Sequence, residues 1–432
     1  MKEPKIRFKG FSGEWKSFNF EQVFSPLKNN SLSRADLSES GDIANIHYGD
    51  VLIKYGECVD TSVDDLTYII DHDTAQRLLR NCALQKGDVI FTDAAEDNTV
   101  GKCSELICKD NERIVSGLHT IACRPKIKIA DRYFGYYLNS PAFHNQLLPH
   151  IQGTKISSIS RRAINTTSVL YPDDKGEQIS LPSFFTSLDA QISASTSRLA
   201  SLKQMKAASL QTMFPQEGET VPKVRFKGFE GEWKKVKFDK AFSFLKNNSL
   251  SRAELCNDGD IINIHYGDVL IKYGDILDIG NDEVIYVADS NVANKLYTDC
   301  PIVNGDIIIA DAAEDFTVGK CVEVQNVTKQ KIVSGLHTIP CRPLESTAPN
   351  FWGYYINSNS FHRQLLPMIQ GSKISSISKT SLSATYVVFP VVEEQQSIAS
   401  FFTSLDRQIT LHAQRLEKLK QIKAACLDKM FV

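Results

Sequence analysis

Two long stretches of the chain carry apolar residues with a helical period. From residue 177 to residue 213 there is no glycine and only one proline, and the apolar residues are separated mostly by three, four or seven positions. They are Leu188, Ile192, Leu199, Leu202, Met205, Leu210 and Met213, and the stripe returns as Leu405, Ile409, Leu416, Leu419, Ile422, Leu427 and Met430. This spacing predicts two long helices, each with one apolar face.

The length of the stripes indicates how these helices are buried. A stripe of roughly 25 residues is longer than the face of a small domain, which disfavours a helix lying only on its own domain. We expect instead that the two helices pair with each other as an antiparallel coiled coil. The expected core of this pair consists of Leu188, Ile192, Leu199, Leu202, Leu405, Ile409, Leu416 and Leu419.

The rest of the chain has a different sequence pattern, in which short runs of apolar residues alternate with turn residues. Residues 87–91 and 120–125 are predicted to be strands because glycine or proline bounds each run. Residues 132–148 carry apolar side chains at near-helical spacing and are interrupted at Pro141, which predicts one or two short helices. These segments predict globular domains of the mixed α+β class.

An internal repeat sets the domain organisation. Residues 4–11 (PKIRFKGF) return as 222–229 (PKVRFKGF), and the same offset relates residues 45–56 to 263–274. A whole unit is therefore duplicated, and we predict two tandem α+β domains, each followed by a long helix, with pseudo-twofold symmetry. The expected boundaries are 1–175 for the first domain, 176–214 for the first helix, 215–222 for a linker, 223–392 for the second domain and 393–432 for the second helix.

The composition excludes several classes of protein. Apolar residues make up 42% of the 432 residues and charged residues 23%, which excludes a disordered or fibrous chain. No run approaches the roughly 18 uncharged apolar residues of a membrane span, and the first residues lack signal-peptide features. Because the net charge is −2, nucleic-acid binding cannot depend on overall charge and requires local basic groups or a partner.

The ten cysteines show no pattern of metal binding. No Cys-x-x-Cys pair is present, and three cysteines recur in the repeat, as the pairs Cys82 and Cys300, Cys103 and Cys321, and Cys123 and Cys341. We therefore expect reduced structural thiols, no metal site and a cytoplasmic location.

Signatures of catalysis are few. The sequence has no phosphate loop, no dinucleotide-binding glycine motif, no nucleophile elbow and no Asn/Asp-Pro-Pro-aromatic stretch of the kind that holds a flipped base. An acidic cluster of Asp93, Glu96 and Asp97, with Lys102 nearby, repeats at 311–320 and can be interpreted as a Mg²⁺ site for phosphodiester hydrolysis. A polar loop after a strand is the favoured interpretation, and a contact to cytosine N4 is a third.

His119 and its copy His337 lie in the same setting, Ser-Gly-Leu-His-Thr-Ile, with no serine or cysteine beside them that suggests an activated nucleophile. We interpret both as structural groups.

Three kinds of segment carry side chains typical of DNA contacts. Residues 152–162 (QGTKISSISRR) and their copy combine a glycine, hydroxyls and cations, which suits phosphate binding, although a helix cap gives the same pattern. Residues 28–34 (KNNSLSR) offer groups that read guanine and adenine, although a simple turn also explains them. Tyr48 and Lys54 can stack or contact phosphate, or can be partly buried sheet positions. The candidates are Lys28, Asn29, Asn30, Arg34, Tyr48, Lys54, Gly153, Thr154, Lys155, Ser157 and Ser158, with Lys246, Asn247, Asn248, Arg252, Tyr266, Lys272, Gly371, Ser372, Lys373, Ser375 and Ser376 in the repeat.

The motifs, in their order, resemble the specificity (S) subunit of Type I restriction-modification systems. Each repeat opens on Pro-Lys-Ile/Val-Arg-Phe-Lys-Gly-Phe-x-Gly-Glu-Trp, carries Gly-Thr/Ser-Lys-Ile-Ser at 153 or 371, and begins its helix with Glu-Gln at 177 or 394. Each closes on Leu-Lys-Gln-Met/Ile-Lys-Ala-Ala-x-Leu-x-x-Met-Phe. The likeness covers essentially the whole chain. Each motif alone is loose, whereas the ordered set, present twice, is fairly specific.

The resemblance implies a non-catalytic protein that binds double-stranded DNA without a cofactor or a membrane. Each domain would be a target recognition domain for one half of a split sequence. The paired helices would act as a spacer that docks two methyltransferase (modification) subunits, with restriction/translocase subunits as further partners. A helix of about 35 residues spans roughly 50 Å, which suits half-sites about one DNA turn apart. Partners that share the phosphate contacts would account for the near-neutral charge.

The similarity of the two repeats adds an expectation about the target. Of the 53 aligned pairs between residues 4–56 and 222–274, 39 are identical, which predicts similar, inverted half-sites in an interrupted near-palindrome. Residues 57–81 and 275–299 share only six of 25 pairs, and base-reading residues there would make the half-sites differ. Two other functions stay open: a stand-alone Mg²⁺-dependent nuclease built on Asp93, Glu96 and Asp97, and a protein scaffold that does not bind DNA.

Overall fold

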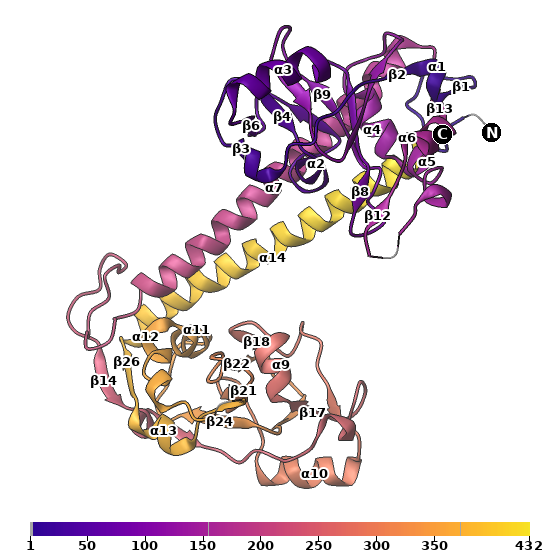
Figure 1. The fold of residues 1–432 in the computed structure, drawn as a ribbon. Helices are drawn as coiled ribbons and strands as arrows, with labels where there is room; N and C mark the ends of the chain where they lie inside the picture. Colours follow the sequence, from indigo (N-terminus) through magenta and orange to yellow (C-terminus); the bar gives the residue numbers. More distant parts are fainter. Residues whose placement is uncertain (1–2, 154, 372) are drawn as a thin grey trace. The chain divides into compact units, whose positions relative to one another are not determined.

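Two compact units make up the chain in the computed structural model, which describes residues 3–153, 155–371 and 373–432 (Figure 1). The first unit comprises Met1–Thr196 with Gln414–Val432, and the second comprises Ser197–Ala413. Both predicted long helices are present, as α7 (Lys175–Thr212) and α14 (Val392–Lys429). Because each helix contributes one end to each unit, neither unit is formed by a single repeat.

Four small sheets organise the first unit. The five-stranded sheet has the order β2 (Phe24–Pro26), β11 (Thr120–Pro125), β7 (Val89–Thr92), β9 (Cys103–Ile107), β5 (Cys58–Asp60). The four-stranded sheet has the order β10 (Ile114–Ser116), β4 (Ala44–Ile46), β6 (Tyr68–Ile69), β3 (Leu37–Ser38). Two antiparallel pairs complete it: β1 (Lys16–Asn19) with β13 (Ser168–Tyr171), and β8 (Ala94–Ala95) with β12 (Ser157–Ser158).

Short helices connect and cover these sheets. They are α1 (Phe20–Val23), α2 (Tyr48–Ile53), α3 (His72–Cys82), α4 (Tyr133–Asn139), α5 (Pro141–His144) and α6 (Arg161–Asn165), with 3₁₀ turns at Arg34–Asp36 and Leu148–His150. Strand β7 is buried along its whole length because both its faces are covered, which explains its continuous apolar run. Helix α3 begins where the Asp71 carboxylate accepts a hydrogen bond from the amide of Thr74.

The second unit repeats this plan. Its five-stranded sheet has the order β15 (Phe242–Phe244), β24 (Thr338–Pro343), β20 (Ile307–Ala310), β22 (Cys321–Gln325), β18 (Ile276–Asp278). Its four-stranded sheet has the order β16 (Leu255–Cys256), β19 (Tyr286–Val287), β17 (Ile261–Ile264), β23 (Lys331–Ser334). The strand pairs are β14 (Lys234–Lys237) with β26 (Tyr386–Phe389), and β21 (Ala312–Ala313) with β25 (Ser375–Ser376). The helices are α8 (Phe238–Ala241), α9 (Tyr266–Ile271), α10 (Ser290–Asp299), α11 (Phe351–Asn357), α12 (Asn359–His362) and α13 (Lys379–Ala384), with 3₁₀ turns at Arg252–Glu254 and Leu366–Met368.

Within each unit the segments of α7 and α14 run antiparallel. In the first unit Phe185 stacks on Phe431, and Asp189 forms an ion pair with Lys423. Residue numbers therefore increase along α7 in the direction in which they decrease along α14. In the second unit Phe214 stacks on Phe402 and Lys206 pairs with Asp406. The expected core residues are buried or half-buried: Leu188, Ile192, Leu416 and Leu419 in the first unit, and Leu199, Leu202, Leu405 and Ile409 in the second. The predicted α+β class with paired helices is confirmed.

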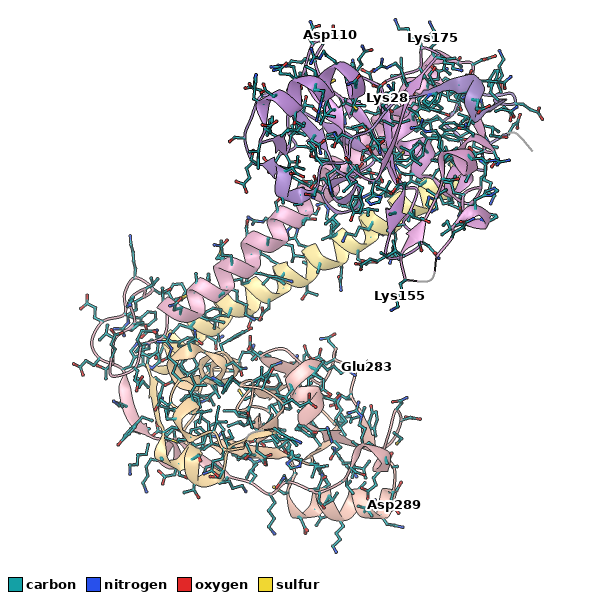
Figure 2. The ribbon with its side chains drawn as sticks, in the orientation of Figure 1. Lys28, Asp110, Lys155, Lys175, Glu283 and Asp289 are labelled. Carbon is teal, nitrogen blue, oxygen red and sulfur yellow. The ribbon has the colours of Figure 1, made fainter. Side chains whose placement is uncertain are left out.

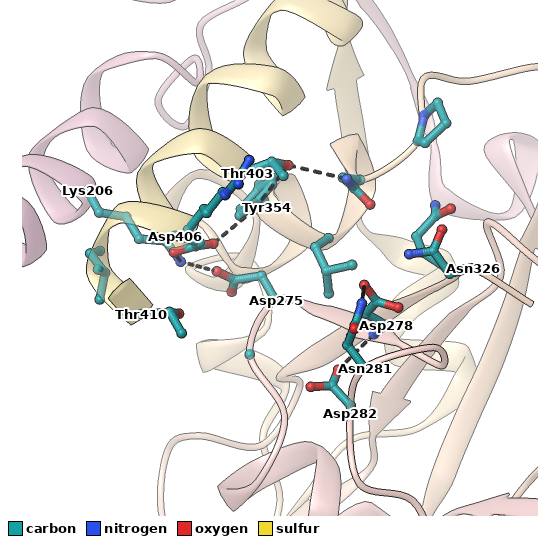
Figure 3. A pocket seen from close by; sticks show the side chains of 17 residues that line it. Lys206, Asp275, Asp278, Asn281, Asp282, Asn326, Tyr354, Thr403, Asp406 and Thr410 are labelled. Carbon is teal, nitrogen blue, oxygen red and sulfur yellow. Dashed lines mark hydrogen bonds and ion pairs between the residues drawn. The ribbon is translucent and has the colours of Figure 1, made fainter. Parts of the chain in front are cut away.

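One detail of the predicted stripe is wrong. Met205 and Ile422 are exposed, although the sequence pattern placed both on the apolar face. The residue that follows each of them, Lys206 on α7 and Lys423 on α14, faces inward instead. Lys206 pairs with Asp275 at 2.7 Å and with Asp406 at 2.6 Å, as Figure 3 shows, and Lys423 pairs with Glu57 and Asp189 at 2.7 and 2.6 Å. A paired lysine with a long apolar stem therefore replaces an aliphatic residue at these positions.

Each lysine is partly buried and is surrounded by two carboxylates and one tyrosine ring. Burial alone would lower the pKa of Lys206, but the charges and hydrogen bonds of Asp275 and Asp406 outweigh it and raise that pKa. The Tyr354 hydroxyl donates to the same Asp406 carboxylate at 2.9 Å, and the ammonium lies 5.4 Å from the tyrosine ring centroid. In the first unit Tyr136 has the same role for Asp189 and Lys423. These contacts of each lysine therefore hold one long helix against the other and against the sheet domain.

The end of each long helix completes a core built by the other repeat. Met430 and Phe431, at the end of α14, belong to the core of the first unit, where the Phe431 ring lies 5.6–6.2 Å from the rings of Trp15, Tyr133, Tyr137 and Phe185. Met213 and Phe214, at the end of α7, belong to the core of the second unit. The closing Met-Phe of each repeat is thus a core element of the other domain.

The opening motif of each repeat fastens the start of a long helix. Arg7 donates two hydrogen bonds of 2.7 Å to Glu177, whose carboxylate is almost entirely buried at the start of α7. Arg225 and Glu394 repeat this contact at the start of α14. A bidentate pair of this kind satisfies a buried carboxylate and gives it one fixed orientation. The arginine of the Pro-Lys-Ile/Val-Arg motif and the glutamate of the Glu-Gln motif therefore act together to hold the start of each long helix in place.

Two further expectations concern the thiols and the membrane. All ten cysteines are free thiols, and burial raises the pKa of the Cys123 thiol to about 12. Among the helices that the structure describes, none combines the length and the apolar composition that a bilayer-spanning segment needs.

We predict that Phe431→Ala and Phe214→Ala act on different units. Each change removes an aromatic side chain from a filled core and is expected to destabilise its unit by about 3–5 kcal/mol. Hydrogen exchange should rise in α4 for Phe431→Ala and in α11 for Phe214→Ala. Each variant is the control for the other, and equal loosening of both helices by either change would contradict the assignment.

Candidate nucleic-acid interface

In the first unit, hydrogen bonds connect the segments that carry the predicted DNA-contacting residues. The Asn29 amide donates to the Thr120 carbonyl at 2.9 Å, which ties the 28–34 loop to the start of β11, directly after the turn that follows β10. The amide of Tyr48, at the start of α2, donates to the Leu118 carbonyl in the same turn. Asp93 then bonds through its backbone to both His119 and Ile159, beside the β8–β12 pair. The second unit repeats the contacts around Tyr266, Asp311 and Ile377, whereas its Asn247 amide donates to the Gly335 carbonyl at 3.4 Å.

Asn30 and Asn248 do not belong to the exposed part of this surface. The Asn30 side chain is buried, donates to Asn45 Oδ1 at 2.7 Å and to the Ser116 carbonyl at 2.8 Å, and accepts a bond from the Leu32 amide. Asn248 is buried in the same way and donates to Asn263. In the structure the hydrogen-bonding groups of these amides stabilise the loop, as the alternative interpretation of residues 28–34 as a turn predicts.

Arg34 and Arg252 are also engaged within the protein. Arg34 forms two hydrogen bonds, of 2.9 and 3.0 Å, to the buried carboxylate of Asp50 on α2, and Arg252 contacts Asp268 at 2.5 Å. The hydrogen bond to Asp50 raises the pKa of Arg34 further above its usual range. The Arg34 side chain is nevertheless 51% exposed, so its contact with guanine stays a prediction. Its role in the structure is to fix the 28–34 loop against α2.

The glycine-serine-lysine segment forms both a hairpin arm, in which Gln152 pairs with Ser158, and a helix cap, in which the Ser160 hydroxyl accepts a hydrogen bond from the Ala163 amide at the start of α6. Ser157 and Ser158 pair with Ala95 and Ala94, and a Cβ on Gly153 would lie 2.0 Å from the Ile156 carbonyl oxygen. With a φ of +103°, Gly153 is required by this turn. Lys155 is exposed, and Gly371 and Lys373 repeat the arrangement. The candidates Thr154 and Ser372 lie outside the described residues.

The remaining candidates differ in exposure. Lys28, Asn29, Lys54 and their copies Lys246, Asn247 and Lys272 are exposed, whereas Tyr48, Tyr266, Ser157, Ser375 and Ser376 are half-buried and Ser158 is exposed. Figure 2 shows Lys28 and Lys155 in the first unit. Lys272 pairs with Glu283 at 2.8 Å, so its charge is partly compensated.

Sequence reasoning missed a pair of side chains in the middle of this surface. His119 Nδ1 lies 2.9 Å from Asp93 Oδ1, and the Tyr48 ring meets the imidazole edge-on with centroids 5.2 Å apart. His337, Asp311 and Tyr266 repeat this arrangement at 3.1 and 5.3 Å. The neighbouring His47 caps the Gly49 amide, and desolvation by burial lowers its pKa. Asp93 and His119 are 26 positions apart in the sequence, and nothing in the sequence indicated a contact between them.

The acidic cluster has the geometry of a loop. Asp97 accepts hydrogen bonds from the amide and hydroxyl of Thr99, Asp93 faces His119, and Glu96 is exposed. Lys102 donates to the Leu52 and Tyr55 carbonyls at the end of α2, and burial lowers its pKa. Within the described residues, no group of three or more His, Cys, Asp or Glu side chains is placed to hold a metal ion.

Comparison with known proteins identifies the repeated unit. Residues 231–421 match the family model described as the Type I restriction modification DNA specificity domain. This segment is similar to a Type I DNA specificity domain. The match covers most of the second repeat, and the first repeat is its duplicate in sequence and in sheet order. The specificity domain thus includes α8 to α13, the hairpin arm at Gly371 and most of α14.

Two solved structures share the fold over nearly the whole chain. One is the Type I restriction-modification S subunit from M. genitalium, with a TM-score of 0.57 and 13% identity over 100% of this chain and 99% of that chain. The other comes from a study of complex assembly and conformational transition in the type I R-M system, with a TM-score of 0.53 and 15% identity over 96% and 97% of the two chains. At these identities the likeness shows a shared fold, with two α+β domains and two long helices.

We predict that Asn30→Ala affects stability rather than sequence preference. The change leaves the buried Asn45 Oδ1 without its partner and removes one of two hydrogen bonds to the Ser116 carbonyl, which is expected to cost about 1–3 kcal/mol. Hydrogen exchange should rise in residues 28–34 and 114–120. The matched control is Asn29→Ala, which removes one hydrogen bond from an exposed side chain. A folded, equally stable Asn30→Ala chain with altered base preference would contradict the structural role.

Proposed function

We propose that this chain is a non-catalytic subunit that reads a bipartite DNA target and places methyltransferase and restriction subunits on it. The observation that carries this proposal is a DNA specificity domain duplicated within one chain. A protein with two similar readers suits a target in two parts, because each reader engages one half-site. Helix α7 has 38 residues, which corresponds to a length of about 57 Å and suits half-sites about one DNA turn apart.

The exposed basic groups support this proposal more than the overall charge does. Lys28, Lys54 and Lys155 and their copies lie on exposed positions of the candidate interface, whereas the net charge is −2. Local cations of this kind bind phosphates and position a protein on a duplex. Partner subunits would supply the remaining phosphate contacts.

The stand-alone nuclease is the weaker candidate. Its acidic residues are engaged with Thr99 and His119, and Lys102 stabilises the end of α2. Incubation of the purified chain with Mg²⁺ and plasmid tests this alternative directly, since the proposed subunit should not cut DNA alone. A scaffold that does not bind DNA would show no salt-sensitive mobility shift with duplex DNA.

We predict that Lys155→Ala weakens binding to every duplex to a similar extent. The exposed ammonium at the hairpin arm is assigned to phosphate, so its loss should reduce the salt slope of the binding constant by about one. Titration at several salt concentrations measures this slope. The control is Lys109→Ala, next to Asp110, which Figure 2 shows on the side of the first unit away from Lys155. A loss confined to one target sequence would refute the phosphate assignment.

We predict that the methylated target is an interrupted near-palindrome. The candidate loops are nearly identical in the two repeats, so both readers present the same groups to DNA. Sequencing the methylome of cells that express this chain with its methyltransferase reveals the target. Two unrelated half-sites would show that the divergent segments 57–81 and 275–299 read the bases.

A further inference from the structure

His119 and His337 combine features that a purely structural histidine does not need. Their side chains are 49% and 51% exposed, although each lies at the end of a buried turn. Both residues have a φ of +53°, a conformation that glycine and asparagine adopt with less strain than histidine. The same strained residue is present in both repeats.

The surrounding turn is built to hold this conformation. A Cβ on Gly117 would lie 2.6 Å from the Ile46 carbonyl oxygen and 2.7 Å from the Asn45 amide nitrogen, so only glycine fits. The Ser116 and Thr120 hydroxyls are hydrogen-bonded at 2.7 Å, and Thr120 also donates to the Gly117 carbonyl. This buried network fixes the backbone on both sides of His119. The position of the imidazole is thus determined by the fold before any ligand binds.

Asp93 determines which ring nitrogen faces outward. A carboxylate accepts but does not donate, so the Nδ1 atom that faces Asp93 carries the proton. The Nε2 atom of the neutral ring is then a hydrogen-bond acceptor. Phosphate oxygens are acceptors as well and give this nitrogen no partner. In the major groove the available donors are the exocyclic amino groups of adenine (N6) and cytosine (N4).

The location of the ring fits such a contact. The Tyr48 ring supports one side of the imidazole, and Asp93 is joined by its carbonyl to the amide of Ile159, next to the hairpin arm that carries Lys155. Exposed basic groups therefore lie on segments that directly adjoin the histidine turn. An acceptor held rigidly among phosphate-binding groups is the arrangement that direct base readout requires.

We propose that His119 and His337 each read one base pair of the target, by accepting at Nε2 a hydrogen bond from an exocyclic amino group. This inference rests on the proposed function. Because Asp, Tyr and His are the same in both repeats, the two contacts read the same base pair at symmetric positions of the two half-sites.

The test uses the full chain with its methyltransferase subunits and a pool of randomised DNA duplexes. Sequences bound by the wild-type complex are compared with those bound by His119→Gly and His337→Gly, since glycine accepts the positive φ and removes the ring. His119→Gly should make one position degenerate in one half-site, and His337→Gly the symmetric position in the other. The control is His412→Gln on α14, which should leave the selected sequence unchanged.

A second measurement identifies the contacted atom. Purine in place of adenine, or pyrimidin-2-one in place of cytosine, removes the amino group at the selected position. This change should weaken wild-type binding about tenfold and leave binding by the glycine variant unaffected. The inference is overturned if the glycine variants select the unchanged sequence, if each degrades both half-sites, or if their losses are uniform over all duplexes with a smaller salt slope. A wild-type complex that selects no sequence would instead overturn the proposed function, and this inference with it.

Discussion

The exchange of helix ends between the two repeats is the constraint on which the rest of the structure depends. The rings of Trp15, Tyr133 and Tyr137 need Phe431 to close their core, and Phe431 is separated from them by about two thirds of the chain or more. Burial of such rings is the largest favourable term available to a domain of this size. Folding of the first domain is therefore coupled to the presence of the last helix, and folding of the second domain to α7.

The polar contacts make this exchange specific. An aromatic core accepts several similar arrangements, whereas the pairs of Lys206 with Asp275 and Asp406 require one register of helix against helix and helix against sheet. Removal of either lysine would leave two carboxylates close together in a partly buried site. The bidentate pair of Arg7 with Glu177 fixes the other end of the same helix. Aromatic packing thus supplies stability, and charge pairing selects the register.

The architecture could be predicted from the sequence because periodicity and repetition are local signals. The duplication, the two helices and the strand at 120–125 all follow from patterns within a few residues. The environment of single polar residues could not be predicted in the same way. Asn30 is rich in hydrogen-bonding groups whether it faces DNA or Asn45, and only the fold shows that it faces Asn45. The pairing of Asp93 with His119 depends on two loops that meet only in three dimensions.

The divergent segments show which residues the fold itself requires. Between residues 57–81 and 275–299, the identical positions include Asp71, which caps α3, the buried Ala75, and Asp60 and Asp64, which bond to each other. Their copies have the same roles, which explains why these residues match while their neighbours do not. Other buried positions, such as Val59 and Ile69, change only to another apolar residue (Leu277 and Val287), whereas the exposed positions are free to differ between the units. The Asp, Tyr and His residues around His119 and His337 present the same chemistry twice, so the divergent segments are the largest region in which the two units can differ in what they recognise.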